Sequence, residues 1–278
     1  MRDPGGLPVE TRLQPEAGEA SRENWYDAAW LAKFIEAKTI VARVAPSRLR
    51  EFDAAFDVLR VPPDFSQRFL AGLLSADQLE RVRETVRAIP MDKLELHETE
   101  KFGRFIVHDW PEFTALQAEL VDVVSEAANE AVEPSYNFLS LYTKMGVCQP
   151  HLDTPSAKWT LDVCIGQSEP WPIHFSQPIA WPERLEDLRE TAPDELTANS
   201  ALYFTAEVLM LGDAILFSGT NQWHYREALP PRPGKQFCDL LFFHYVPFGT
   251  ADLIQPRNWA RLFDIPQLAE MADLDRFY

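Results

Sequence analysis

The sequence predicts a mainly β fold with helical additions, of the α+β class, in which a sandwich or barrel follows an N-terminal helical part. Two observations predict this fold. Up to about residue 135 the apolar residues recur mostly at helical spacing. After Pro134, segments rich in β-branched and aromatic residues follow one another, separated by Gly, Pro, Asn and Asp. Strands without intervening helices favour a sandwich or barrel over a parallel sheet.

Residues 23–135 are predicted to be a mostly helical buttress for the β region. Ser75 followed by Gln78 fits a capping box, which marks a helix start. The apolar residues that then share one helix face are Leu79, Val82, Val86 and Ile89. A second helix is predicted from residues that recur at steps of three or four: Phe113, Leu116, Leu120, Val124 and Ala127.

Residues 136–248 are predicted to form the β core, and the whole chain is predicted to be one domain. Five segments read as strands: YNFLSLYTK, KWTLDVCIG, ALYFTAEVLML, DAILFSG and QFCDLLFFHYV. Residues 177–199 are rich in proline and acids and are predicted to be an insertion or lid. Residues 249–278 return to helical spacing. Residues 1–22 combine prolines, glycines and charges without apolar periodicity, which predicts a mobile tail.

Charge and composition exclude several classes of partner. A chain of 278 residues with a net charge of −17 is a poor binder of nucleic acid or of an anionic membrane, because both reward basic patches. No apolar run is long enough to span a bilayer, and the N-terminus lacks the pattern of a secretion signal. Three cysteines without a CxxC pair are typical of reduced thiols, so we expect a cytoplasmic protein.

Histidines and one aspartate suggest a metal site in the β core. His151 and Asp153 stand in QPHLDTP, directly after a predicted strand. Alternate residues of a strand share a face, so this pair can direct an imidazole and a carboxylate to one point. Two histidines and a carboxylate form the facial triad that binds non-haem Fe(II). His224, at the start of another predicted strand, is the best third ligand; His174 and His244 are expected to be core residues.

A metal held by three residues has open positions, which a bidentate 2-oxo acid and O2 would fill. The distal carboxylate of such an acid needs a cation, because burying an unpaired charge is costly. Lys235 opens the final predicted strand, where its side chain would point into a barrel. Arg232 stands between two prolines in a loop, and Arg226 would share a face with His224. The residues alone leave this choice open.

The chain resembles the Fe(II)/2-oxoglutarate-dependent oxygenases, and most of all their prolyl-hydroxylase-like branch, in the order of five segments: YTKMGVCQPHLD, KWTLDVCIG, WPIHF, LGDAILFSGTNQWH and GKQFCDLLFFHYV. The resemblance implies a double-stranded β-helix, a cupin-like jelly-roll barrel with helices against one sheet. It also implies Fe(II), with 2-oxoglutarate and O2 as co-substrates. The family's catalytic metal ligands fall on His151, Asp153 and His224.

The resemblance also implies residues that bind the co-substrate. The family's cation for 2-oxoglutarate falls on Lys235, and its strand tyrosine falls on Tyr142. The segment PRPGKQFCD departs from the usual pattern around this cation, so Arg232 stays an alternative to Lys235. Asp153 supplies a carboxylate where halogenating members have a small residue, which makes halogenation an unexpected reaction.

The function expected from these residues is hydroxylation of an unactivated C–H bond in a small molecule, either an amino acid or a natural-product intermediate. The same iron enzyme acting as a desaturase or oxidative cyclase is an alternative. A cupin-like binding protein without turnover is another. Zinc proteases, Ser-His-Asp hydrolases and P-loop nucleotide-binding proteins are disfavoured, because HExxH, GxSxG and GxxxxGK[ST] motifs are absent from the sequence.

Overall fold

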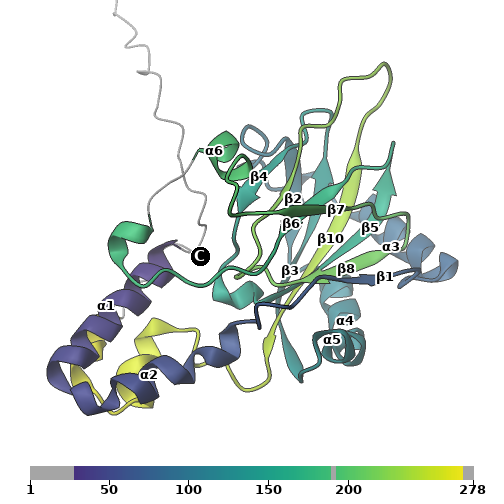
Figure 1. Cartoon of the computed structure of the whole chain (residues 1–278). Coiled ribbons are helices and arrows are strands. Elements are labelled where there is room, and N and C mark those ends of the chain that lie inside the picture. The colour runs from purple at the N-terminus through teal and green to yellow at the C-terminus, as the bar shows by residue number, and fades with distance from the viewer. Residues whose placement is uncertain (1–27, 189–191, 272–278) are drawn as a thin grey trace, which may run out of the picture.

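Within residues 28–188 and 192–271, which the computed structural model describes, ten strands form two facing antiparallel sheets (Figure 1). The tail predicted over residues 1–22 lies outside the described residues. The larger sheet has the order β1-β8-β5-β10-β3-β2 and the smaller one β4-β9-β6-β7. The strands are β1 (Arg68–Leu70), β2 (Arg104–His108), β3 (Val132–Tyr142), β4 (Cys148–His151), β5 (Trp159–Gln167), β6 (Ile173–Ser176), β7 (Phe204–Glu207), β8 (Ala214–Phe217), β9 (His224–Arg226) and β10 (Cys238–Pro247).

From β3 to β10 the strands alternate between the two sheets, except that β6 and β7 both belong to the smaller sheet, and this is the topology of a jelly roll. The strands β3, β5, β8 and β10 belong to the larger sheet, whereas β4, β6, β7 and β9 belong to the smaller one. The predicted double-stranded β-helix core is therefore confirmed. The space between the two sheets, called the barrel interior below, is filled by side chains of both sheets: Tyr142, Cys164, Ile173, Phe175, Ile215, Phe217, Leu240 and Phe242.

The alternate residues of the larger sheet point outward and pack against helices. The outer face carries Leu139, Leu161, Val163, Leu241 and Phe243, all within one apolar cluster. The helices that cover it are α3 (Ala76–Ala88), α4 (Pro111–Glu119) and α5 (Val121–Ala128). Helix α3 begins with the predicted capping box, in which the Ser75 side chain accepts a hydrogen bond from the Gln78 backbone N–H. The second predicted helix is divided into α4 and α5 at Leu120, although its apolar face stays continuous.

The first and last helical parts of the described chain form a second apolar cluster beside the sheets (Figure 1). It is built by α1 (Ala28–Val44), α2 (Leu49–Ala55), α7 (Trp259–Leu262) and the 3-10 turn Pro266–Met271. The Trp30 indole donates to the Ile254 carbonyl at 2.8 Å and stands edge-on to the Trp259 ring at 5.6 Å. The sequence predicted both parts as helical but not that they pack together. No described helix has the length and apolarity that a membrane crossing requires.

Candidate metal centre

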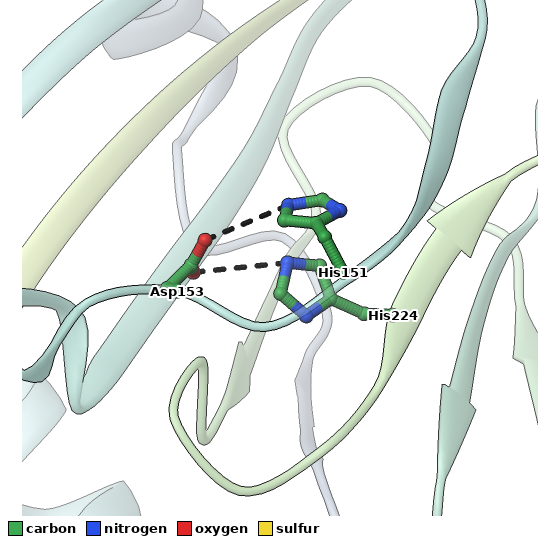
Figure 2. A group of neighbouring side chains, drawn as sticks. All are labelled: His151, Asp153 and His224. Carbon is green, nitrogen blue, oxygen red and sulfur yellow. Dashed lines mark ion pairs between the residues drawn. The ribbon is translucent and has the colours of Figure 1, made fainter. Parts of the chain in front are cut away.

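Three predicted ligands meet at one edge of the smaller sheet. His151 ends β4 and His224 begins β9, and the two are cross-strand partners. Asp153 follows two residues after His151 and faces both imidazoles (Figure 2). Its Oδ1 lies 3.5 Å from Nε2 of His151, and its Oδ2 lies 3.7 Å from Nε2 of His224. One donor atom from each residue fits within a 4.8 Å span, so the three could hold one metal ion.

Neighbouring backbone groups fix both imidazoles with Nε2 toward the carboxylate. Nδ1 of His151 lies 2.7 Å from the Gln149 carbonyl, and Nδ1 of His224 lies 3.0 Å from the Gln222 carbonyl. These contacts place the ring proton on Nδ1 and leave the Nε2 lone pair for a metal, as is usual for metal-binding histidines. The donor set of two imidazoles and one carboxylate fits Fe(II) with open positions for other ligands.

Asp153 is held from its backbone and from its side chain. Its N–H donates to the Gly219 carbonyl at 2.8 Å, and the Thr160 hydroxyl donates to Oδ2 at 3.1 Å. A Cβ on Gly219 would lie 2.5 Å from the Ala157 carbonyl oxygen and closer still to Oδ2 of Asp153. Only a glycine at this position lets the carboxylate lie where it does.

The three ligands differ in their protonation. Burial opposes the charge of His151, but the Cys148 sulfur and Asp153 raise the pKa of His151 to about 10. Burial, assisted by the charge of His151, lowers the pKa of His224 to about 4. Burial would raise the pKa of Asp153, but His224 and His151 hold it well below its usual range. The carboxylate is therefore ionised and His224 is neutral, and a bound cation would replace the proton of His151.

The predicted insertion supports the metal centre from outside. Leu152, between two of the ligands, and Trp223, next to the third, pack against Leu196. Leu196 belongs to α6 (Pro193–Thr197) within the insertion. The backbones are joined as well, because the Ile179 N–H donates to the Asn221 carbonyl at 2.7 Å. The described part of residues 177–199 thus lies against the outer face of the ligand-bearing segments.

Replacing Leu196 with alanine should weaken metal binding more than a core truncation elsewhere. The change opens a cavity behind Leu152 and Trp223, and changes behind a ligand shell cost about 10- to 100-fold in metal affinity. We expect about tenfold weaker Ni(II) binding in calorimetry. Leu120→Ala is the matched control. Leu120 is 6% exposed against 5% for Leu196, and it packs in the apolar cluster between the helices and the larger sheet. Equal Ni(II) affinities in the two variants would contradict a supporting role for α6.

The structure separates the residues predicted to bind the co-substrate. Tyr142 is buried in the barrel interior, 2% exposed. Lys235 is exposed and lies over the Phe237 ring, 5.0 Å from its centroid. The Arg232 side chain is 64% exposed and pairs with Glu169 at 3.1 Å. Neither of these two cations contacts the three metal-ligand candidates in the described part of the chain. Binding of a co-substrate by any of the three residues stays a prediction.

Two buried arginines lie in the barrel interior instead. Arg226 follows His224 by two residues on β9 and therefore shares its face, as the spacing indicates. Arg104, at the start of β2, is the cross-strand partner of Tyr142 and donates to its hydroxyl at 2.8 Å. The Cys148 thiol lies 3.7 Å from Nδ1 of His151. Burial would raise the pKa of this thiol, but His151, and to a smaller extent the two arginines, lower it. Sequence reasoning missed Arg104, because no local motif marks it.

The other strand histidines have different surroundings. The His174 ring stacks on Tyr225 at 4.5 Å on the side of the smaller sheet that faces away from the barrel interior. His244 is buried, 2% exposed, and stacks on Tyr136 at 4.0 Å with the planes 8° apart. Within the part of the chain that the structure describes, its Nδ1 has no hydrogen-bond partner. His244 lies opposite Thr160 in the sheet, on the Asp153 side of the metal centre.

Comparison with known proteins identifies the fold. No protein-family model and no curated protein matches the chain. HygX from Streptomyces hygroscopicus, crystallised with nickel and 2-oxoglutarate, matches with a TM-score of 0.51 at 14% identity, over 72% of this chain and 87% of HygX. SnoN, a non-heme alpha ketoglutarate dependent epimerase from nogalamycin biosynthesis, matches with a TM-score of 0.50 at 15% identity, over 76% of this chain and 90% of SnoN. The chain therefore has the same fold as HygX and SnoN.

Proposed function

We propose that the chain is an Fe(II)/2-oxoglutarate-dependent dioxygenase that hydroxylates an unactivated C–H bond of a small molecule. The observation that carries the proposal is the convergence of His151, Asp153 and His224 in a fold shared with HygX and SnoN. A binding protein without turnover would need the barrel but not three oriented donor groups. Membership of the prolyl-hydroxylase-like branch and a cytoplasmic location stay predictions.

Each part of the centre would have a distinct role in this reaction. His151, Asp153 and His224 would hold Fe(II), which with 2-oxoglutarate and O2 supplies an oxidant strong enough for C–H cleavage when bound. Thr160 would keep Asp153 in place through its hydrogen bond to Oδ2. The packed barrel interior would exclude water from the reacting groups, and fixed geometry would select one C–H bond.

The Asp153 side of the centre offers a wall of aromatic rings to a substrate. Phe138 stacks on Phe242 at 4.9 Å and on His244 at 5.5 Å, and His244 stacks on Tyr136. Burial lowers the pKa of His244 to about 4, so this imidazole is neutral. Rings and a neutral imidazole suit the apolar part of a natural-product intermediate better than a free amino acid. HygX has been crystallised with the small molecule hygromycin B, which supports a small-molecule substrate.

Succinate formation tests the proposed activity. Protein loaded with Fe(II) under anaerobic conditions and then supplied with O2 and 2-oxoglutarate should release succinate slowly even without the substrate. A panel of amino acids and natural-product intermediates should contain compounds that accelerate this release. Protein that binds Fe(II) but forms no succinate under any of these conditions would support the alternative of a cupin-like binding protein.

The mass of the product under ¹⁸O2 distinguishes hydroxylation from its alternatives. Hydroxylation adds one labelled oxygen to the substrate that the panel identifies. Loss of two hydrogens without label would instead indicate a desaturase or oxidative cyclase, because both reactions begin by removing the same hydrogen. The intact carboxylate at Asp153 leaves no halide position among the ligands, so a halogenated product is not expected.

A further inference from the structure

Four cationic side chains are candidates for binding the distal carboxylate of the 2-oxo acid, and they differ in their exposure to solvent. Arg232 and Lys235 have exposed side chains, where water screens their charges. Arg104 and Arg226 are 9% and 3% exposed and point into the barrel interior with Tyr142. A cation in a poorly hydrated interior attracts a carboxylate far more strongly than one at the surface. The choice is therefore between the two buried arginines.

Arg226 is held in an ion pair with a completely buried carboxylate. Its Nη2 pairs with Oδ2 of Asp162 at 2.6 Å, and its Nη1 donates to the Trp171 carbonyl. Asp162 is completely buried, and among the described residues its Oδ1 has no hydrogen-bond partner. Turning Arg226 toward a ligand would leave this carboxylate unpaired in the interior, which is strongly unfavourable. Arg226 therefore neutralises Asp162 and is not available for the co-substrate.

Arg104 can bind a further carboxylate. Its Nε pairs with Glu98, whose side chain is 21% exposed, and its Nη1 donates to the Tyr142 hydroxyl at 2.8 Å and to Ser140 at 3.4 Å. These bonds do not involve Nη2. Burial raises the pKa of Tyr142, so its hydroxyl stays protonated and, while accepting from Arg104, can donate its own proton. Burial opposes the charge of Arg104, but Tyr142 and Glu98 raise its pKa.

The position of Arg104 suits an extended diacid that starts at the metal. Cys148 lies three residues before His151 and touches its ring, and the N–H of the neighbouring Val147 donates to the Phe102 carbonyl at 3.1 Å, two residues before Arg104. Arg104 and Tyr142 therefore lie on the Cys148 side of the metal-ligand candidates. His244 and the aromatic rings stacked on it lie on the Asp153 side. One side thus offers a cation and a hydroxyl, and the other offers aromatic rings.

We propose that Arg104, with the Tyr142 hydroxyl beside it, binds the distal carboxylate of 2-oxoglutarate in place of a cation on the last strand. This inference rests on the proposed function. It makes β2, which precedes the jelly-roll strands β3 to β10, part of the co-substrate site. It also makes Arg104 the residue that selects a five-carbon 2-oxo diacid over a 2-oxo acid with one carboxylate.

Calorimetry on Ni(II)-loaded protein tests the assignment without turnover. We expect Arg104→Met to weaken 2-oxoglutarate binding about 10- to 100-fold, the loss expected for one charge-assisted hydrogen-bonded pair. Binding of 2-oxovalerate, which has the same chain length without the distal carboxylate, should change less than about threefold, so the preference for the diacid disappears. Arg83→Met is the matched control, because Arg83 donates to the Ile165 carbonyl at 2.7 Å on the helix side of the larger sheet.

Two further variants keep the test decisive. If Arg104→Met does not fold, Tyr142→Phe removes one hydroxyl and should weaken 2-oxoglutarate severalfold while leaving 2-oxovalerate unchanged. Lys235→Met tests the cation that the sequence favours. A loss of 2-oxoglutarate affinity in Lys235→Met with none in Arg104→Met would overturn the proposal. Wild-type protein that binds Ni(II) but no 2-oxoglutarate would instead contradict the proposed function itself.

Discussion

Replacing Asp153 with alanine is expected to abolish turnover and to weaken Ni(II) binding by more than about a hundredfold, beyond the cost of changes behind the ligands. The carboxylate is the one anionic ligand, and it faces the imidazoles of both His151 and His224. Without it, the two imidazoles of the centre remain, and they hold a divalent cation weakly. The fold should persist, because the strands pack through apolar clusters that do not include the three metal-ligand candidates.

The measurement combines metal titration with thermal unfolding. Metal-free Asp153→Ala should unfold within a few degrees of metal-free wild type, and added Ni(II) should stabilise only the wild type. Asp252→Ala is the control, because this carboxylate is 64% exposed and pairs with Arg261 away from the centre. Full Ni(II) affinity in Asp153→Ala would show that the metal binds elsewhere.

The triad was predictable because its signal is local. The H-x-D prediction needed only the two-residue period of a strand, and Asp153 lies two residues beyond His151, the last residue of β4. His224 was predictable because a strand begins at it, after a turn that contains glycine. That it pairs directly with His151 depends on the register between β4 and β9, which no local pattern records.

The co-substrate residues were less predictable because they depend on which strands pair. Lys235 was expected to open the last strand, but β10 begins at Cys238, and Lys235 stays in the preceding exposed loop. Arg104 reaches Tyr142 only because β2 adds to the edge of the larger sheet next to β3. Pairing between distant segments is set by the packing of the whole sheet, so residue spacing cannot reveal it.

The helices likewise have features that local sequence predicts and features that depend on distant contacts. The capping box of α3 was predictable because Ser75 and Gln78 contact each other within one turn. The cluster that joins α1 to the C-terminal segment was not, because Trp30 and Trp259 lie near opposite ends of the described chain. Apolar spacing predicts which face of a helix is buried and leaves its partner open.

Replacing Gly219 with alanine is expected to lower metal affinity at least about tenfold, although Gly219 has no side chain to offer. The added methyl group would lie 2.5 Å from the Ala157 carbonyl oxygen and closer still to Oδ2 of Asp153. The Ala157 carbonyl belongs to the backbone and cannot move without disturbing the chain around it. The Asp153 carboxylate is the group that must move, and the Gly219 carbonyl that accepts from the Asp153 N–H would be displaced with it.

Gly166→Ala separates this clash from a general effect of the added methyl group. A Cβ there would meet Oδ2 of Asp239 at 3.1 Å, the end of a side chain that can turn away. We expect near wild-type Ni(II) binding in Gly166→Ala and at least tenfold weaker binding in Gly219→Ala, in line with the cost of displacing a supported ligand. Wild-type affinity in Gly219→Ala would mean that Asp153 can bind metal from another rotamer, and that the close approach to Gly219 does not position the ligand.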